Sequence, residues 1–339
     1  MGERRTRQWS DAVSVRVLVS GATSLLGGAV ARRLQTRGDD VTVFQRRPSG
    51  LGFREVLGDV ADRSAVDTAV AGVDVAIHAA ARVSVVGPWS AFAAANITGT
   101  ANMLDAARSA GVTRFVYVSS PSVANAGKSL VGARAGPADP DLARDYYSRS
   151  KASAELSALA AATDGFSVVA VRPHLVWGPG DTQLVGRIVT RARQGRLAVI
   201  GSGGALIDTT YIDNAADAIV AAADRADGLS GRAFVVSNGQ PRPVRELLNR
   251  IALAAGLEPP RLRVPVGVAR AAGTVLERAW ARLQREDDPP ITRFLAEQLS
   301  TAHWFDQRET RAALGWQPLV HLDEGFARLE SWFLARRNG

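Results

Sequence analysis

Cysteine is absent from this chain of 339 residues, which excludes disulfides, thiolate catalysis and cysteine-ligated metals. Long hydrophobic runs are absent too, because none approaches the ~18 apolar residues that a membrane-spanning helix needs. The first ten residues are charged and lack the apolar core of a signal peptide. We therefore expect a cytoplasmic protein in which residues 1–12 form a flexible tail.

Blocks of like charge are also missing. The net charge is +8 and arginine supplies most of the positive count, but no run of five or more like charges occurs. A scattered arginine surface explains this pattern better than a nucleic-acid interface does. His78, His174 and His303 lie far apart in the sequence and show no metal-ligand spacing. We expect neither a nucleic-acid partner nor a bound metal.

The first half of the chain alternates strand-like and helical stretches. Short β-branched runs recur, and helical patterns lie between most of them. The expected strands are 15–19, 41–44, 54–57, 73–78, 115–119 and 167–171. This alternation predicts an α/β protein with a doubly wound parallel sheet, a Rossmann fold, covered by helices on both faces.

After residue 180 the pattern becomes mostly helical, with short strands near Ala198 and Thr209 and a strand-like run at 233–237. The chain is long enough for one large and one small domain. We expect a nucleotide-binding Rossmann domain at 13–180 and a smaller, mostly helical substrate-binding lobe at 181–339. No clear linker separates them, so the lobe is expected to interleave with the sheet domain.

A glycine-containing loop follows the first expected strand and opens a helix, which is the context of a dinucleotide site. Gly21 permits the tight turn, and Gly27 permits close packing of the helix on the strand. Ser24 stands where the usual spacing has glycine, and it could donate to a phosphate. Free N–H groups at the helix start would face a pyrophosphate. The predicted cofactor contacts of the loop are Gly21, Thr23, Ser24, Leu25, Leu26 and Gly27.

The end of the second expected strand favours one cofactor over the other. NAD sites usually place an acidic residue there, ~20 residues after the glycines, to bind the ribose 2′-hydroxyl. Here the residue is Gln45, followed by Arg46 and Arg47. Guanidinium groups attract a 2′-phosphate and can bind it bidentately. NADP(H) is therefore the predicted cofactor, in preference to NAD(H).

Tyr147 and Lys151 stand four residues apart, downstream of the fifth expected strand. Residues i and i+4 of a helix share one face. An ammonium beside a phenol stabilises phenolate, so we expect Lys151 to lower the pKa of Tyr147 from about 10. The pair would then supply a proton near neutral pH. Tyr146 lies five residues before Lys151, so we expect it to pack elsewhere.

With these motifs together, the chain resembles the extended short-chain dehydrogenases/reductases over nearly its whole length. The departures from the family pattern are Ser24 and Ser20, where glycine and threonine are more usual. The matching segments are 20–27, 58–60, 78–81, 96–100, 118–120, 147–151, 172–173 and 314–318.

Five further segments carry a narrower resemblance, and they are 119–123, 172–181, 211–217, 237–239 and 303–306. Within the superfamily the chain is similar to the 3β-hydroxysteroid-dehydrogenase-like branch, and these segments resemble the bacterial 2-alkyl-3-oxoalkanoate reductases. The narrower resemblance implies NADPH-dependent reduction of the ketone of a long-chain 2-alkyl-3-oxoalkanoic acid, in an olefin or β-lactone pathway of lipid metabolism.

The resemblance also implies roles for individual residues. Tyr147 would donate a proton and Lys151 would bind the nicotinamide ribose. Ser120 would hydrogen-bond the substrate carbonyl, with Ser122 as a second candidate. Asn96 would either hold the proton-relay geometry near Lys151 or make a structural hydrogen bond to the backbone. The other implied contacts are Asp59, Val60, Ala79, Ala80 and Pro173 for the cofactor, and His174, through a carboxylate, and Ser122 for the substrate.

Two other functions stay open. One is a 3β-hydroxysteroid dehydrogenase or another NAD(P)-dependent alcohol dehydrogenase on the same scaffold. The other is a sensor or scaffold that binds NADP without turnover, although such proteins usually lack the Tyr/Lys pair. The expected partners are a lipid-like small molecule, enzymes of the same pathway, a membrane surface met by the amphipathic stretch 266–283, and a second copy of the chain.

Overall fold

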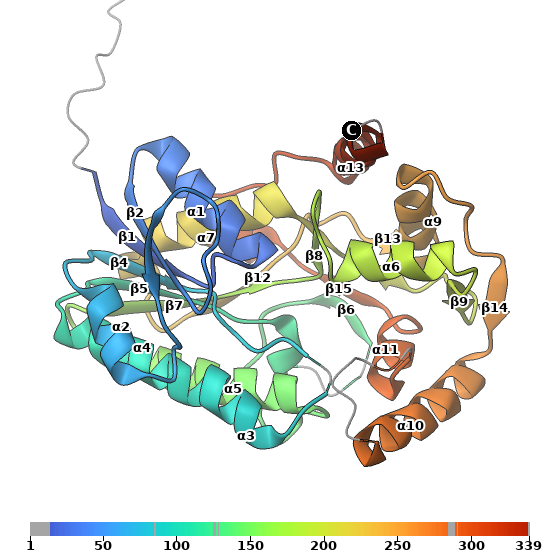
Figure 1. Ribbon diagram of the computed structural model, residues 1–339, viewed down its shortest axis with the longest axis horizontal. Helices are drawn as coiled ribbons and strands as arrows, with labels where there is room; N and C mark the ends of the chain where they lie inside the picture. Colours follow the sequence, from blue (N-terminus) through green and yellow to red (C-terminus); the bar gives the residue numbers. More distant parts are fainter. Residues whose placement is uncertain are drawn as a thin grey trace, which may run out of the picture.

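A parallel sheet lies at the centre of the computed structural model, which describes residues 14–84, 86–124, 127, 129–283, 289 and 291–337. Seven strands follow the order β12-β7-β5-β4-β1-β2-β3, and all neighbours are parallel (Figure 1). The predicted doubly wound sheet is confirmed. The strands are β1 (Arg16–Ser20), β2 (Asp40–Gln45), β3 (Arg54–Leu57), β4 (Val75–His78), β5 (Arg114–Val118), β7 (Ser167–Pro173) and β12 (Ala233–Val236).

The chain starts in the middle of this sheet, runs outward through β2 and β3, and then crosses to β4 on the other side of β1. The strand order therefore reverses between β1 and β4. Ligands of open α/β sheets bind at such a reversal, in the crevice outside the carboxyl ends of the strands. The expected tail at 1–12 lies outside the described residues.

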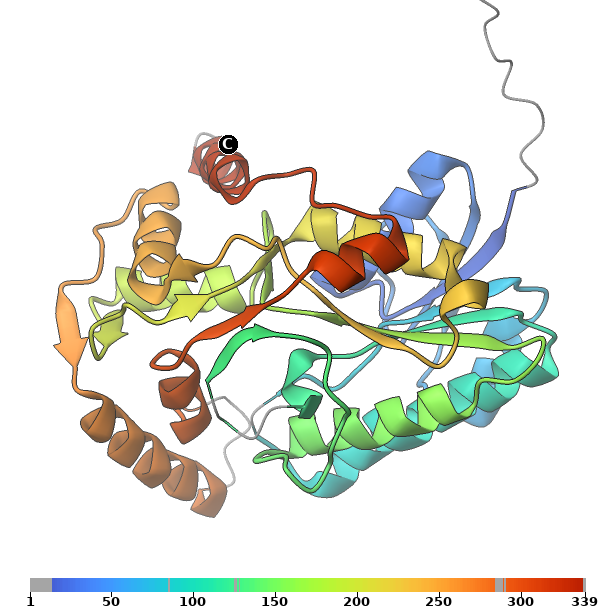
Figure 2. The same ribbon diagram turned by 180° about the vertical axis from the view of Figure 1, so that it is seen from behind.

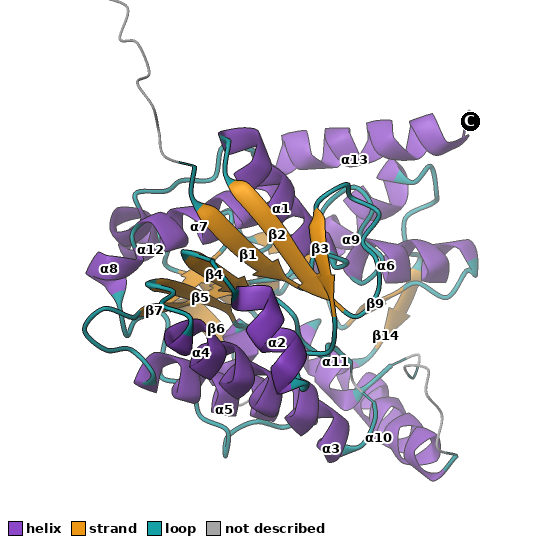
Figure 3. Cartoon of the chain, turned by 60° about the vertical axis from the view of Figure 1, so that its left-hand side comes forward, coloured by secondary structure: helices purple, strands orange, loops and turns teal. Residues whose placement is uncertain are grey.

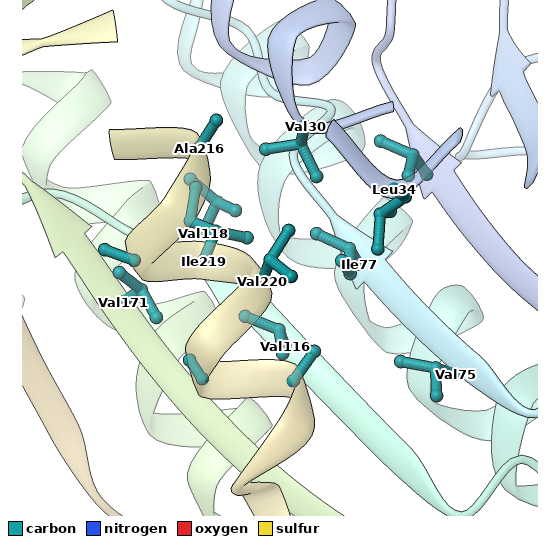
Figure 4. Close-up of a cluster of buried hydrophobic side chains, with 14 of the residues drawn as sticks. Val30, Leu34, Val75, Ile77, Val116, Val118, Val171, Ala216, Ile219 and Val220 are labelled. Carbon is teal, nitrogen blue, oxygen red and sulfur yellow. The ribbon is translucent and has the colours of Figure 1, made fainter. Parts of the chain in front are cut away.

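One face of the sheet is covered by helices from both halves of the chain. Figure 4 shows Val30 and Leu34 of one helix and Ile219 of another packed over Val116 and other sheet residues. Buried aliphatic side chains at helical spacing give each helix its inward face. These helices are α1 (Leu25–Arg37), α7 (Ile212–Asp224), α8 (Ala226–Leu229) and α12 (Arg308–Leu314).

The opposite face packs against three further helices, as the views in Figures 1 and 3 show. They are α2 (Arg63–Val70), α4 (Gly99–Ser109) and α5 (Tyr146–Ala160). Short pieces connect them to the strands. These are α3 (Trp89–Phe92), a π-helix (Ala93–Thr98) and a 3-10 turn (Pro121–Ala124). A π-helix in a helical run often marks a functional site.

The remaining elements form a second lobe beside the sheet, in which β6 and β15 lie side by side and β15 leads into α12 (Figure 2). Its helices are α6 (Leu184–Arg193), α9 (Val244–Ala254), α10 (Val266–Arg282), α11 (Arg293–Gln298) and α13 (Leu322–Arg337). Its strands are β6 (Leu130–Ala133), β8 (Val176–Trp177), β9 (Ala198–Ile200), β10 (Leu206–Ile207), β11 (Thr210–Tyr211), β13 (Arg242–Pro243), β14 (Leu262–Val264) and β15 (His303–Phe305).

The two parts of the molecule share chain segments and core. β12 and α7 come after residue 181 yet complete the sheet and its cover, so residues beyond 180 contribute to both parts. In the lobe, Trp177 stacks on Phe326 with ring centroids 4.6 Å apart. Leu25 and Leu26 of the nucleotide loop pack against the same cluster. None of the helices in the described ranges is long and apolar enough to cross a membrane.

Candidate active site

Helix α5 carries both members of the Tyr/Lys pair. Asp145 begins it as the N-cap, where its carboxylate accepts from the Ser148 N–H at 2.8 Å. This satisfies a backbone donor that the helix itself leaves unpaired. The pair therefore lies in the first two turns, with Lys151 buried and Tyr147 partly buried. The exposed ring of Tyr146 packs against Trp89, with centroids 5.6 Å apart, away from the pair.

Three hydroxyls meet where β5 ends. The Oγ atoms of Ser120 and Ser122 are 3.0 Å apart in the turn that follows the strand. The Ser120 hydroxyl lies close enough to the Tyr147 phenol to lower the pKa of that phenol. The structure thus groups Tyr147, Ser120 and Ser122 at the carboxyl edge of the sheet, where a carbonyl oxygen could accept from a phenol and a serine together.

The pKa of Tyr147 differs from the sequence-based expectation. Burial raises it to about 12, and the hydrogen bond from Ser120 only partly opposes that rise. The expectation that Lys151 lowers this pKa is wrong for this structure. The Lys151 ammonium donates to the Val118 carbonyl at 2.6 Å and lies 4.1 Å from the Tyr117 ring centroid. Tyr147 is consequently a neutral phenol, a proton donor, throughout the physiological range.

The pKa of Tyr147 is raised, whereas that of Lys151 is lowered. Burial lowers its pKa to about 7, and the nearby Glu155 carboxylate opposes the shift. Glu155 lies one turn further along α5 and is fully buried with Arg172 of β7. The Arg172 Nε donates to Glu155 Oε2 at 2.9 Å, and Nη2 donates to the other carboxylate oxygen. Sequence reasoning missed Glu155, although its i+4 spacing from Lys151 was a usable signal.

Asn96 lies within the π-helix and is buried. Its Oδ1 accepts from the Arg82 N–H at 2.7 Å, and its Nδ2 donates to the Arg82 carbonyl at 3.2 Å and to Ser150 Oγ at 2.8 Å. The two contacts with Arg82 are the backbone contacts of the structural alternative, and the third reaches the side chain of the residue before Lys151.

The nucleotide loop joins β1 to α1. Gly21 has φ +78°, and a Cβ there would meet the Ala80 Cα at 2.8 Å. A Cβ on Gly27 would collide with the Gly21 carbonyl, so both glycines are required. Ser24 is the N-cap of α1: its hydroxyl donates to the Gly21 carbonyl at 2.8 Å and accepts from the Gly27 N–H at 3.0 Å. Its proton is therefore committed within the loop. Thr23 is exposed.

His78 ties this loop to its neighbours. It is buried at the end of β4, with Nδ1 2.7 Å from Ser20 Oγ and Nε2 3.1 Å from Thr100 Oγ1. Ser20 Oγ also accepts from the Ala80 N–H at 3.1 Å. Ala79 and Ala80 are thus held beside Gly21, across the reversal in strand order.

Gln45 ends β2 and is 5% exposed, and neither its amide oxygen nor its amide nitrogen has a hydrogen-bond partner among the described residues. Unpaired buried polar atoms are costly, so a polar ligand at this position would stabilise the site. Arg46 and Arg47 follow and are exposed, and Arg46 lies 4.0 Å from Asp59. Together with the glycine loop, this donor set fits the adenosine end of a dinucleotide.

Comparison with known proteins adds to this geometry. Residues 17–237 match the model of the NAD dependent epimerase/dehydratase family. The chain belongs to this family. It is therefore an extended short-chain dehydrogenase/reductase and an NAD(P)-dependent oxidoreductase.

Among relatives, the 2-alkyl-3-oxoalkanoate reductase of Stenotrophomonas maltophilia is 41% identical over 94% of this chain and 99% of that protein. The 3 beta-hydroxysteroid dehydrogenase/Delta 5-->4-isomerase of Mycobacterium tuberculosis is 31% identical over 94% and 90%. A dTDP-glucose 4,6-dehydratase from Streptomyces venezuelae, solved with NAD bound, shares the fold with a TM-score of 0.74, at 24% identity over 96% of this chain and 98% of that one. The first of these relatives supports a ketoreductase role for this family member.

Two of the predicted site residues lie where β7 ends, because Pro173 is its last residue and His174 follows it. Pro173 and His174 are buried, and His174 packs edge-on against Phe305 with centroids 5.1 Å apart. Burial and the neighbouring His303 lower the pKa of His174 to about 3. The His174 imidazole is therefore uncharged at neutral pH, and an uncharged imidazole attracts a substrate carboxylate less strongly than an imidazolium does. Leu175, next in the chain, has φ +43°, a strained value for leucine of the kind that clusters at functional sites.

Among the described residues, no cluster of three or more His, Asp or Glu side chains could hold a metal ion. Val60 is buried in the segment between β3 and α2, and its carbonyl accepts from Asn102 Nδ2 at 3.0 Å. Asp59 caps the following turn by accepting from the Ala61 N–H at 2.9 Å.

Acid should destabilise the protein through its buried histidines. Burial lowers the pKa of both His78 and His174 to about 3, so the unfolded chain binds these protons at higher pH than the folded one. The free energy of unfolding should fall as pH drops from 6.5 toward 3, by up to about 2 kcal/mol per histidine by pH 5. Urea unfolding at several pH values measures this slope. His321→Gln, at an exposed site, should leave it unchanged.

Proposed function

We propose that this protein reduces the ketone of a long-chain 2-alkyl-3-oxoalkanoic acid to the 2-alkyl-3-hydroxy acid with NADPH, in a lipid pathway of the olefin or β-lactone type. The observation that carries the proposal is the position of Tyr147 beside Ser120, whose hydroxyl is hydrogen-bonded to that of Ser122, at the carboxyl edge of the sheet. The similarity to a named 2-alkyl-3-oxoalkanoate reductase supports the substrate class.

The chain's own residues account for the polar part of this chemistry. Bound NADPH supplies the hydride. Tyr147, protonated at neutral pH, donates its proton to the developing alkoxide. Ser120 stabilises the same oxygen through its hydroxyl, with Ser122 holding Ser120 at 3.0 Å. Lys151 would hold the nicotinamide ribose, and Asn96 acts through Ser150 as a positioning residue.

The cofactor would lie along the edge between β2 and β4. The loop residues Gly21 to Gly27 would face the pyrophosphate, whereas Ala79, Ala80 and Pro173 would border the nicotinamide half. Asp59 and Val60 would border the adenine. Gln45 offers its unpaired amide to the ribose, and Arg46 and Arg47 offer positive charge to a 2′-phosphate.

Removing both guanidinium groups with Arg46→Ala/Arg47→Ala should raise the KM for NADPH by about 10- to 100-fold, because charged hydrogen bonds to the phosphate are lost. The KM for NADH should stay nearly constant. Initial rates with each cofactor measure the effect. Arg63→Ala, which removes an exposed arginine of α2, is the matched control. Equal losses with NADPH and NADH would reject the 2′-phosphate role.

The reaction is best tested backwards, because β-keto acids decarboxylate. A long-chain 2-alkyl-3-hydroxy acid is supplied with NADP⁺ or NAD⁺, and the absorbance of the reduced cofactor is followed. Turnover with NADP⁺ supports the proposal. Oxidation of a 3β-hydroxysteroid without turnover of the hydroxy acid would favour the second candidate, which the mycobacterial relative suggests. Cofactor binding without turnover of either substrate would favour a sensor or scaffold.

The proposal also covers the compartment, the oligomeric state and the partners of the protein. We expect a cytoplasmic homodimer that works with other enzymes of its pathway. The exposed Val268, Val275 and Leu283 in and beside α10 are the side chains that would meet a membrane surface.

A further inference from the structure

Arg82 lies at the edge of the sheet where the reaction is expected. It follows β4 by four residues, and the carboxyl end of β4 adjoins those of β1 and β5 at the reversal in strand order. Side chains at this edge face the ligand crevice of α/β folds. The functional roles proposed above leave this arginine unused.

The backbone of Arg82 is fixed relative to the proposed proton donor. Asn96 bonds both the N–H and the carbonyl of Arg82, at 2.7 and 3.2 Å. The same amide donates to Ser150 Oγ, which in turn donates to the Tyr147 carbonyl at 2.9 Å. Two side chains therefore connect the arginine to the turn of α5 that carries Tyr147, so a ligand held by Arg82 would keep a defined distance from the phenol.

Few of the N–H donors of the Arg82 guanidinium are used in hydrogen bonds to the described residues. Its Cζ lies 5.1 Å from the Phe92 ring centroid, which orients the guanidinium plane. Its Nη2 reaches the Val86 carbonyl only at 3.4 Å, and its buried Nε has no partner in the part of the chain that the structure describes. No carboxylate of the described residues forms an ion pair with it. A guanidinium is a planar fork of five N–H donors, and one that makes so few hydrogen bonds within the protein can bind a carboxylate bidentately.

We propose that Arg82 is the specificity-determining residue that binds the carboxylate of the keto-acid substrate. The inference rests on the proposed function, because only a β-keto acid carries a carboxylate one carbon away from the ketone. Fixing the carboxylate at Arg82 and the ketone oxygen at Tyr147 and Ser120 orients the substrate by two points. A neutral ketone or a sterol would gain nothing from the arginine.

The test compares an acid with its ester in the oxidative direction. A 2-alkyl-3-hydroxy acid and its methyl ester are each supplied with NADP⁺ to the wild type, to Arg82→Met and to Arg82→Lys. Arg82→Met should lose about 30-fold or more in kcat/KM for the acid, mainly through KM, since one partner of a charged pair is removed. Its rate with the ester should stay within about threefold, which also shows that the variant is folded. Arg82→Lys should fall between, because lysine keeps the charge without the fork.

Arg149→Met is the matched control. Arg149 is exposed and stacks on Trp89 with Cζ 5.1 Å from the ring centroid, in the aromatic group beside Arg82, and its loss should change neither rate. Equal losses on acid and ester in Arg82→Met would overturn the inference. So would weaker NADPH binding by that variant, measured by fluorescence titration, because the guanidinium would then bind a cofactor phosphate. A wild type that turns over neither acid nor ester would reject the proposed function itself, and with it the carboxylate.

Discussion

Tyr147→Phe should reduce the keto acid about 10²- to 10⁴-fold more slowly than the wild type and bind the cofactor equally well. We propose the phenol as the proton donor beside Ser120, and phenylalanine keeps the ring while removing the hydroxyl proton. Steady-state rates in both directions, together with a fluorescence titration of the cofactor, measure the two halves of this expectation.

The neighbouring tyrosine supplies a matched control. Tyr146→Phe removes a hydroxyl from a ring that is 49% exposed and packs on Trp89 and Phe92, so its rate should stay within about twofold of the wild type. Comparable losses in Tyr146→Phe and Tyr147→Phe would contradict the assignment of the donor. A Tyr147→Phe variant with full activity would point to another acid, with Ser120 as the first to examine.

Glu155→Gln should lower the free energy of unfolding by about 3–5 kcal/mol. The change leaves the Arg172 guanidinium, 1% exposed, with a neutral amide in place of its carboxylate partner. Its only other acceptor contact among the described residues is the Gly136 carbonyl at 2.7 Å. Urea unfolding followed by circular dichroism at neutral pH measures the loss.

Two comparisons show whether burial causes this effect. Asp67→Asn breaks the exposed pair with Arg63, 2.8 Å apart on α2, and should cost less than about 1 kcal/mol. The double variant Glu155→Leu/Arg172→Met removes both charges and should recover much of the stability. A single variant no less stable than Asp67→Asn would show that Arg172 finds another counter-charge or water.

The strands and the helix α1 could be predicted because each rests on local patterns. β-branched runs placed six strands of the sheet, and the glycine-containing loop was expected to open a helix, which is α1. Local patterns also brought out Gly21, Gly27 and the Tyr147/Lys151 spacing. Each of these depends on neighbours within one turn or one loop.

Contacts between distant segments could not be predicted in this way. The pairing of Glu155 with Arg172 joins a helix to a strand, and nothing in either segment identifies the partner. The pKa of Tyr147 follows burial by several elements, whereas the i+4 rule considers only Lys151. Asn96 was open between two roles because its partners, Arg82 and Ser150, lie 14 and 54 residues away.

The return of the chain from the second lobe to the sheet has a consequence for how the protein acquires its fold. Val171 of β7 pairs with Phe234 of β12, and α7 covers the face that α1 shares, so the sheet is complete only when residues beyond 230 are present. During synthesis at about 5–20 residues per second, the first 180 residues wait for seconds with an open strand edge and an uncovered apolar face. High contact order of this kind slows folding and exposes the nascent chain to aggregation. The sheet that carries the nucleotide loop is therefore completed only after β12 has been synthesised.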